Sequence, residues 1–91
     1  MSNGELQVSL RKVTHSRSSI AIDWSNDHRA TRVSVVKPQG RGESTLEESS
    51  HQPLPTHLVD RHLSPGIHIY IITNWDDSGS SGQVRLPVKL T

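Results

Sequence analysis

The chain has 91 residues, of which 31% are hydrophobic, with no cysteine, no phenylalanine and a formal net charge of +1. At this length there is room for one hydrophobic core, so we expect one domain over residues 1–91, with its folded part at about 5–91. Without cysteine, the chain cannot contain disulfides, thiolate zinc sites or iron–sulfur clusters. Ten Lys and Arg against nine Asp and Glu leave no broad basic field, and no long apolar run is present, so we expect neither nucleic-acid binding nor membrane insertion.

Val, Ile and Leu supply 22 residues against two Ala, a balance that favours β-strands over helices. Alternation of apolar and polar residues is typical of half-buried strands, and it predicts them at residues 6–10, 20–24, 32–36 and 84–90. Weaker patterns predict a short edge strand at 45–47 and a further strand at 56–62. Residues 67–73 are apolar on both faces, which indicates a central strand.

Turn-forming residues separate these strands. Leu63-Ser64-Pro65-Gly66 is a turn sequence, because proline fixes its φ and glycine tolerates a positive φ. Residues 74–82 are rich in Asp, Ser and Gly and are predicted to form a loop. Pro87 lacks a backbone N–H, so we expect it on an edge strand or at a bulge, and the alternation places it on the outer face.

Seven short strands separated by turns predict an all-β fold, a seven-stranded Greek-key β-sandwich. The residues expected in its core are Ile20, Ile22, Trp24, Val33, Val35, Leu63, Ile69 and Ile71.

Three segments resemble a fibronectin type III domain, a member of the immunoglobulin-like sandwiches. Residues 19–24 are similar to that family's second strand, which ends in a core Trp, and 63–69 are similar to its Leu-x-Pro-Gly corner. Residues 74–91 are similar to its last loop and strand. The resemblance implies the sandwich fold and implies that the chain is one domain of a larger multidomain protein.

The resemblance also implies a tyrosine six residues after the corner Leu, where its hydroxyl bonds back to the corner. Ile69 occupies that position and Tyr70 follows it. We expect Ile69 and Ile71 to face the core and the tyrosine corner to be absent. The alternative is a one-residue bulge that brings Tyr70 inward, because a slip of one residue reverses every later side chain.

No motif predicts catalysis or metal binding. The six histidines lack the spacing that would aim two imidazoles at one ion. The segment from Asp76 to Gly79 has oxygen ligands and a glycine, as calcium loops do, but lacks their third carboxylate and distant glutamate. The serines lack a G-x-S-x-G setting. We therefore predict no enzyme activity, no catalytic residue, no metal and no cofactor.

Trp75 is the main candidate for a binding residue, because it opens a loop and an exposed indole is a common interface anchor. The alternative is that Trp75 closes one end of the sandwich by packing on the first strand. The full candidate protein interface is Arg32, Tyr70, Trp75, Asp76, Asp77 and Arg85. A basic stripe of Arg32, Arg85 and Lys37 on an outer face is a further expectation.

The function that fits these features is a non-catalytic protein–protein interaction module, expected as a monomer whose partner is another protein. The alternatives are a structural spacer without a ligand and an accessory domain that binds carbohydrate or polyanions. The sequence contains no Asn-x-Ser/Thr site and no cysteine, which fits an intracellular setting better than a secreted one.

Overall fold

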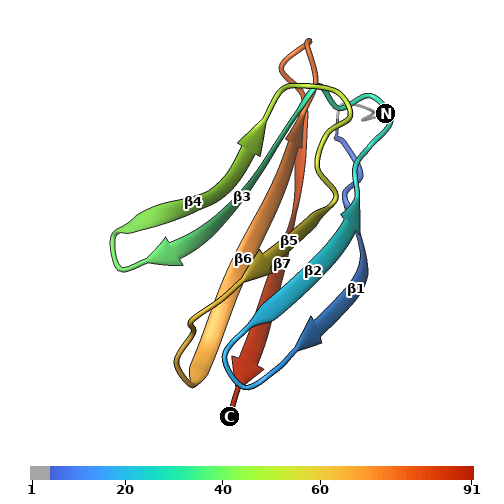
Figure 1. Cartoon of the computed structure of the whole chain (residues 1–91). Coiled ribbons are helices and arrows are strands. Elements are labelled where there is room, and N and C mark those ends of the chain that lie inside the picture. Colours follow the sequence, from blue (N-terminus) through green and yellow to red (C-terminus); the bar gives the residue numbers. More distant parts are fainter. Residues whose placement is uncertain (1–4) are drawn as a thin grey trace.

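The computed structural model describes residues 5–91 of the chain. These residues form two antiparallel sheets packed face to face (Figure 1). The strands are β1 (Ser9–His15), β2 (Ile20–Ser25), β3 (Arg32–Gln39), β4 (Gly42–Ser49), β5 (His57–Asp60), β6 (Gly66–Trp75) and β7 (Ser81–Leu90). One sheet has the order β1-β2-β5 and the other the order β4-β3-β6-β7. This arrangement confirms the predicted all-β, seven-stranded sandwich.

The core lies between the sheets and is centred on Trp24 of β2. Trp24 is 1% exposed, and Ile20 and Ile22 on the same face of β2 are fully buried. Val33 and Val35 of β3 meet them from the other sheet, also fully buried. These five predicted core positions are confirmed, because strict alternation on β2 and β3 leaves one apolar face that must turn inward.

β1 lies later in the chain than predicted. Leu6 is buried, but it precedes the strand, and its N–H donates to the carbonyl of Ser81 at 3.2 Å. Leu10, predicted to face inward, is 36% exposed. A register shift between Leu10 and Lys12 disrupts the alternation, so that Val13 becomes the inward residue of the later part of β1.

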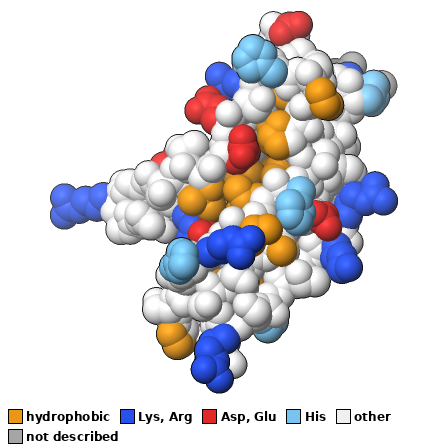
Figure 2. Space-filling model, viewed as in Figure 1, with side chains coloured by type: hydrophobic (Ala, Val, Ile, Leu, Met, Phe, Trp, Pro, Cys, Tyr) orange, Lys and Arg blue, Asp and Glu red, His pale blue; other side chains and the backbone are white. Residues whose placement is uncertain are grey.

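β4 is a full strand of eight residues, whereas the sequence predicted a short one at 45–47. Its side chains are mostly exposed or half-buried, so no apolar alternation marks it in the sequence. Leu46 packs against the core at the register shift of the β3–β4 pair. The hairpin turns at Gly40, whose φ is 59°, and its tip projects from the body of the sandwich (Figure 1). A cationic side chain extends from this tip (Figure 2).

β6 corrects the predicted register. Tyr70 and Ile72 are fully buried, whereas Ile67 is 66% exposed and Ile69 and Ile71 are half-buried on the outer face. The expectation that Ile69 and Ile71 face the core is therefore wrong. The cause is the pairing with β7, in which Leu86 lies opposite Tyr70 and Val84 opposite Ile72. Directly opposed residues share a face, so the inward residues of β7 turn Tyr70 and Ile72 inward.

β6 and β7 also extend further than predicted. Asn74 and Trp75, predicted to begin a loop, are the last residues of β6, and Ser81 begins β7. The connecting loop is therefore residues 76–80. Pro87 is exposed on β7, an edge strand, as predicted from its missing N–H.

Candidate functional site

Arg32 and Trp75 form a stacked pair on the outer face of the four-stranded sheet. They are opposite each other in the β3–β6 pairing. The guanidinium carbon of Arg32 lies 4.0 Å from the centroid of the Trp75 ring, a cation–π arrangement. Trp75 is half-buried, and its carbonyl accepts a 2.8 Å hydrogen bond from the N–H of Thr31. The backbone on both strands thus holds the indole in place with part of it open to solvent.

The loop after Trp75 is ordered by one carboxylate. Oδ1 of Asp76 accepts hydrogen bonds from the hydroxyl and N–H of Ser78 and from the N–H of Ser80, at 2.8 to 2.9 Å. The Ser78 hydroxyl bond contributes most to holding the pKa of Asp76 below its usual range. Gly79 adopts a φ of 91°, which completes the turn. The loop presents the exposed carboxylate of Asp77 from a fixed backbone.

A hollow of about 370 Å³ lies between this loop and the sheet. It is lined by Thr31, Arg32, Ser50, Trp75, Asp76 and Asp77. Four of the six predicted interface residues therefore come together: Arg32, Trp75, Asp76 and Asp77. The hollow combines an aromatic surface, a cation and carboxylates, a mixture suited to a polar side chain or a turn of a partner protein.

Arg85 lies on the same outer face, but it is opposite Ile71 on β7 and does not line this hollow. Tyr70 is fully buried, so its place in the predicted interface is wrong. The physical reason is the register of β6, which turns Tyr70 toward β5. Its hydroxyl donates to Oδ2 of Asp60 on β5 at 2.8 Å, which is a different bond from the tyrosine-corner bond to residues 63–66 that the resemblance implies.

Lys37 does not lie in the predicted basic stripe on the outer face. Its ammonium lies 2.8 Å from Oδ2 of Asp60 and 5.1 Å from the centroid of the Tyr70 ring, between the two sheets. Burial alone would raise the pKa of the Asp60 carboxyl, but the hydrogen bonds from Lys37 and Tyr70 outweigh it and lower this pKa. The pKa of the Tyr70 hydroxyl is raised mainly by burial and, to a smaller extent, by its hydrogen bond to Asp60. Lys37 therefore serves as an inter-sheet contact.

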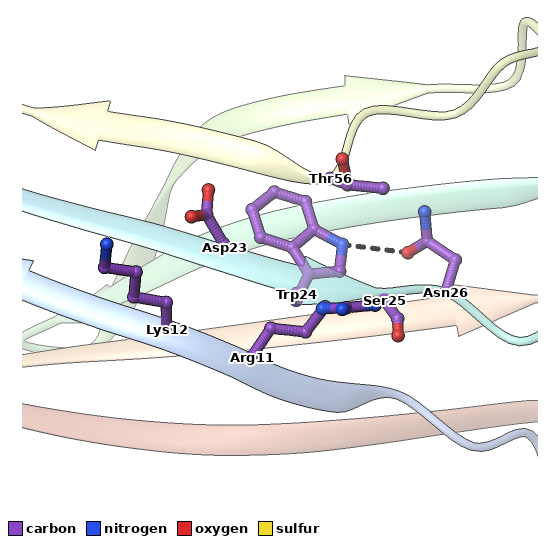
Figure 3. Close-up of a pocket in the computed structure, with 7 residues that line it drawn as sticks. All are labelled: Arg11, Lys12, Asp23, Trp24, Ser25, Asn26 and Thr56. Carbon is purple, nitrogen blue, oxygen red and sulfur yellow. Dashed lines mark hydrogen bonds between the residues drawn. The ribbon is translucent and has the colours of Figure 1, made fainter.

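Sequence reasoning missed a buried polar cluster beside Trp24. Asn74 is fully buried; its Oδ1 accepts from the N–H of Asp27 at 2.8 Å, and its Nδ2 donates to Oδ1 of Asn26 at 3.0 Å. The same oxygen of Asn26 accepts from Nε1 of Trp24 at 2.8 Å (Figure 3). Nothing in the sequence marks Asn74 as inward, because Asn before Asp and Ser residues is also typical of a loop.

Asp27 continues this cluster toward the surface. Its side chain is 4% exposed, and its two oxygens accept from the N–H of Gln7, the N–H of Arg29 and the guanidinium of Arg29, at 2.7 to 3.1 Å. The pKa of the Asp27 carboxyl is held far below its usual range, mainly by the side-chain hydrogen bonds from Arg29 and then by the backbone N–H groups of Arg29 and Gln7. This cluster fixes the loop between β2 and β3 against the end of β6.

A second and larger hollow, about 720 Å³, lies beside β1 and β2 (Figure 3). It is lined by Arg11, Lys12, Asp23, Trp24, Ser25, Asn26 and Thr56. The polar atoms of Trp24 and Asn26 bond to each other, and Asp23 contacts Nδ1 of His57. These contacts account for Trp24, Asn26 and Asp23. The Arg32–Trp75 hollow is the better candidate because it brings together four of the predicted interface residues.

Among residues 5–91, no group of three or more histidines and carboxylates is placed to hold a metal ion. No helix long and apolar enough to cross a membrane occurs in this part of the chain. The face viewed in Figure 2 shows hydrophobic side chains gathered between the β3–β4 hairpin and β5, with Lys, Arg, Asp, Glu and His side chains around them.

No protein-family model matches the sequence, and no curated protein sequence matches it. Solved structures do resemble the fold. A structure of an FN3tt mutant has a TM-score of 0.65 and 10% identity, covering 93% of this chain and 92% of the other. This is a fibronectin type III-like domain fold. A crystal structure of FN3tt agrees, with a TM-score of 0.57 and 7% identity over 89% of this chain and 91% of the other.

The fibronectin type III-like fold is shared more widely within the immunoglobulin-like sandwiches. The PKD1 domain of the metalloprotease PrtV from Vibrio cholerae has a TM-score of 0.57 and 17% identity to this chain, covering 94% of each. At such identities the similarity establishes the sandwich and not the activity. The resemblance seen in the sequence is thereby confirmed at the level of the fold.

Proposed function

We propose that this chain is a non-catalytic accessory module of a larger protein and that it binds another protein through the Arg32–Trp75 hollow. The observation that supports this most directly is the Arg32 guanidinium 4.0 Å from the ring centroid of a half-buried Trp75, beside a hollow of about 370 Å³. Trp and Arg are the residues most enriched among those that dominate binding energy at interfaces.

The arrangement also reduces the entropic cost of binding. Trp75 is held by the β3–β6 pairing, and the loop that supplies Asp77 is held by the bonds to Asp76. Side chains that are already ordered lose less conformational freedom when a partner binds. Asp77, which is exposed, is suited to receive a cationic or hydrogen-bond-donating group of the partner.

The test is affinity capture from an extract of the source cells with immobilised wild type and Trp75→Ala. We expect the wild type to retain a protein that Trp75→Ala loses, while both variants unfold at similar temperatures. Val59→Ala, at a 38% exposed apolar residue of the other sheet, is the matched control and should retain the same protein. Equal capture by Trp75→Ala and the wild type would contradict the proposal.

A spacer role is the second candidate, and the path of the chain favours it. Leu6 bonds to Ser81 at the start of β7, and β7 then runs ten residues to Leu90, a rise of roughly 30 Å. The chain therefore enters at one end of the sandwich and leaves at the other (Figure 1). This geometry suits an array of domains, and a spacer would capture no partner in the experiment above.

A further inference from the structure

The outer face of the four-stranded sheet has an apolar stripe along β6. Ile67, Ile69 and Ile71 all point outward, and Ile67 is 66% exposed. The exposed Pro87 of β7 extends the stripe opposite Ile69, and the buried Val36 of β3 lies beneath it opposite Ile71. The chain is only 31% hydrophobic, yet it places these apolar side chains on the outer face. An apolar stripe on a protein surface is typical of an interaction site.

Charges of opposite sign flank this stripe on the two edge strands. Arg85 and Lys89 are exposed and outward on β7, because they lie opposite Ile71 and Ile67. The outward acidic residues on β4 are Glu43, opposite Pro38, and Glu48, opposite Ser34. Within residues 5–91, none of these four charged side chains forms an ion pair.

These charges cannot neutralise one another within one molecule. Where β3 pairs with β6, β4 and β7 are separated by three strand spacings, or about 14 Å, and after Val36 the β3–β4 hairpin that carries Glu43 diverges from β6 (Figure 1). These separations exceed the reach of a salt bridge and the screening length at physiological ionic strength. Apart from Arg32 and Trp75 at one end, the face therefore has a basic edge on β7, an apolar centre and an acidic edge on β4. Such a surface is complementary to the same surface of a second copy that is rotated by half a turn about an axis parallel to the strands.

We propose that this face binds the same face of a second copy of the chain, about a two-fold axis parallel to β3 and β6. This rotation places the acidic β4 edge of each copy over the basic β7 edge of the other, and the isoleucine stripes meet at the centre. Across the sheet, Arg85 is aligned with Ile71, Val36 and Thr45. Rotation about an axis parallel to the strands keeps this alignment. Arg85 would therefore face β4 of the second copy near Thr45, between Glu43 and Glu48. The net charge of +1 adds little repulsion between copies.

This inference goes beyond the proposed function and replaces the monomer expected from the sequence. Arg32 and Trp75 lie on the same outer face, so a second copy on this face and a partner protein in the hollow would compete for it. The oligomeric state of Ile67→Ser and partner capture by Trp75→Ala are separate measurements, so the failure of one proposal is distinguishable from the failure of the other.

The first test is sedimentation equilibrium of the full chain from about 1 µM to about 1 mM. We expect a reversible monomer–dimer equilibrium within this range. Ile67→Ser should weaken the dimer about tenfold, and Val59→Ser on the other sheet should leave its dissociation constant unchanged. A chain that stays monomeric throughout, or a dimer that Ile67→Ser does not weaken, would overturn the proposal.

The second test exchanges the charged edges. Glu43→Arg with Glu48→Arg gives a face with two basic edges, and Arg85→Glu with Lys89→Glu gives a face with two acidic edges. Each double variant should be monomeric alone, and an equimolar mixture should restore a dimer. Arg11→Glu with Lys12→Glu, at exposed residues of β1, is the control and should dimerise as the wild type does. Circular dichroism verifies that each variant folds. A double variant that still dimerises alone, a mixture that stays monomeric, or a control that loses the dimer would overturn the two-fold arrangement.

Discussion

The ammonium of Lys37 on β3 lies 2.8 Å from Oδ2 of Asp60 on β5, so an ion pair joins the two sheets of the sandwich. The side chains of Lys37 and Asp60 are 12% and 15% exposed, and the hydroxyl of Tyr70 donates to the same oxygen of Asp60. One carboxylate thus accepts from a hydroxyl and pairs with a largely buried cation, whose other polar contact is Nδ1 of His68 at 3.3 Å.

Asp60→Asn should lower the free energy of unfolding by about 2 kcal/mol, because it leaves the ammonium of Lys37 without its counter-charge. Urea unfolding measures this change. Asp77→Asn, at an exposed carboxylate, is the control and should alter stability by less than about 0.5 kcal/mol. If both variants unfold at the wild-type midpoint, the ion pair does not stabilise the fold.

Asn74→Ala should cost about 2–3 kcal/mol, because it leaves the buried N–H of Asp27 without an acceptor and removes a donor to Asn26. The measurement is the thermal midpoint of the variant compared with that of Thr73→Ala, whose side chain is on the outer face. A midpoint equal to that of Thr73→Ala would show that the cluster is dispensable.

Gly82→Ala should cost about 1–3 kcal/mol, because a Cβ there would lie 1.9 Å from the carbonyl oxygen of Leu6. The segment before β1 would have to move away, and the bond between Leu6 and Ser81 would be lost. Gly42→Ala is the matched control, since a Cβ there meets nothing within 4 Å. Equal stability of the two variants would show that Leu6 does not pack against β7 as described.

The stability of the protein should fall in acid. Hydrogen bonds from Arg29 hold the folded pKa of Asp27 below the ordinary 3.8, so its contribution is complete above that pH and is lost as the pH falls through the folded value. Urea midpoints measured from about pH 7 to about pH 2.5 should decline, and Asp27→Asn should be less stable at neutral pH but decline less. A decline as steep in Asp27→Asn would assign the effect to other carboxyl groups.

Arg32→Ala should uncover the Trp75 indole. We expect acrylamide to quench the tryptophan fluorescence more strongly than in the wild type. The free energy of unfolding should fall by about 0.5–1 kcal/mol, because a cation–π pair at the surface is lost. Arg85→Ala, on the same face but not over the ring, should leave quenching unchanged. Unchanged quenching in Arg32→Ala would mean that Arg32 does not cover the indole in solution.

Several features of the candidate site follow from local sequence and others do not. The turn chemistry of Asp76 and Gly79 is local, so a loop near them was predictable. The stacking of Arg32 on Trp75 depends on the alignment of β3 with β6, which no pattern within either strand specifies. The inward position of Asn74 depends on the same alignment and on the loop that contains Asp27.

The sequence by itself determined the sandwich class and the central place of Trp24, because β2 and β7 each have one apolar and one polar face and the inward face is unambiguous. Only the tertiary structure decided which face of β6 is inward. Ile69 and Ile71 on one face and Tyr70 and Ile72 on the other are comparably apolar, so burial of either face gains a similar hydrophobic free energy. Pairing with β7 and the bond from Tyr70 to Asp60 favour one register, and that choice leaves the isoleucines on the surface.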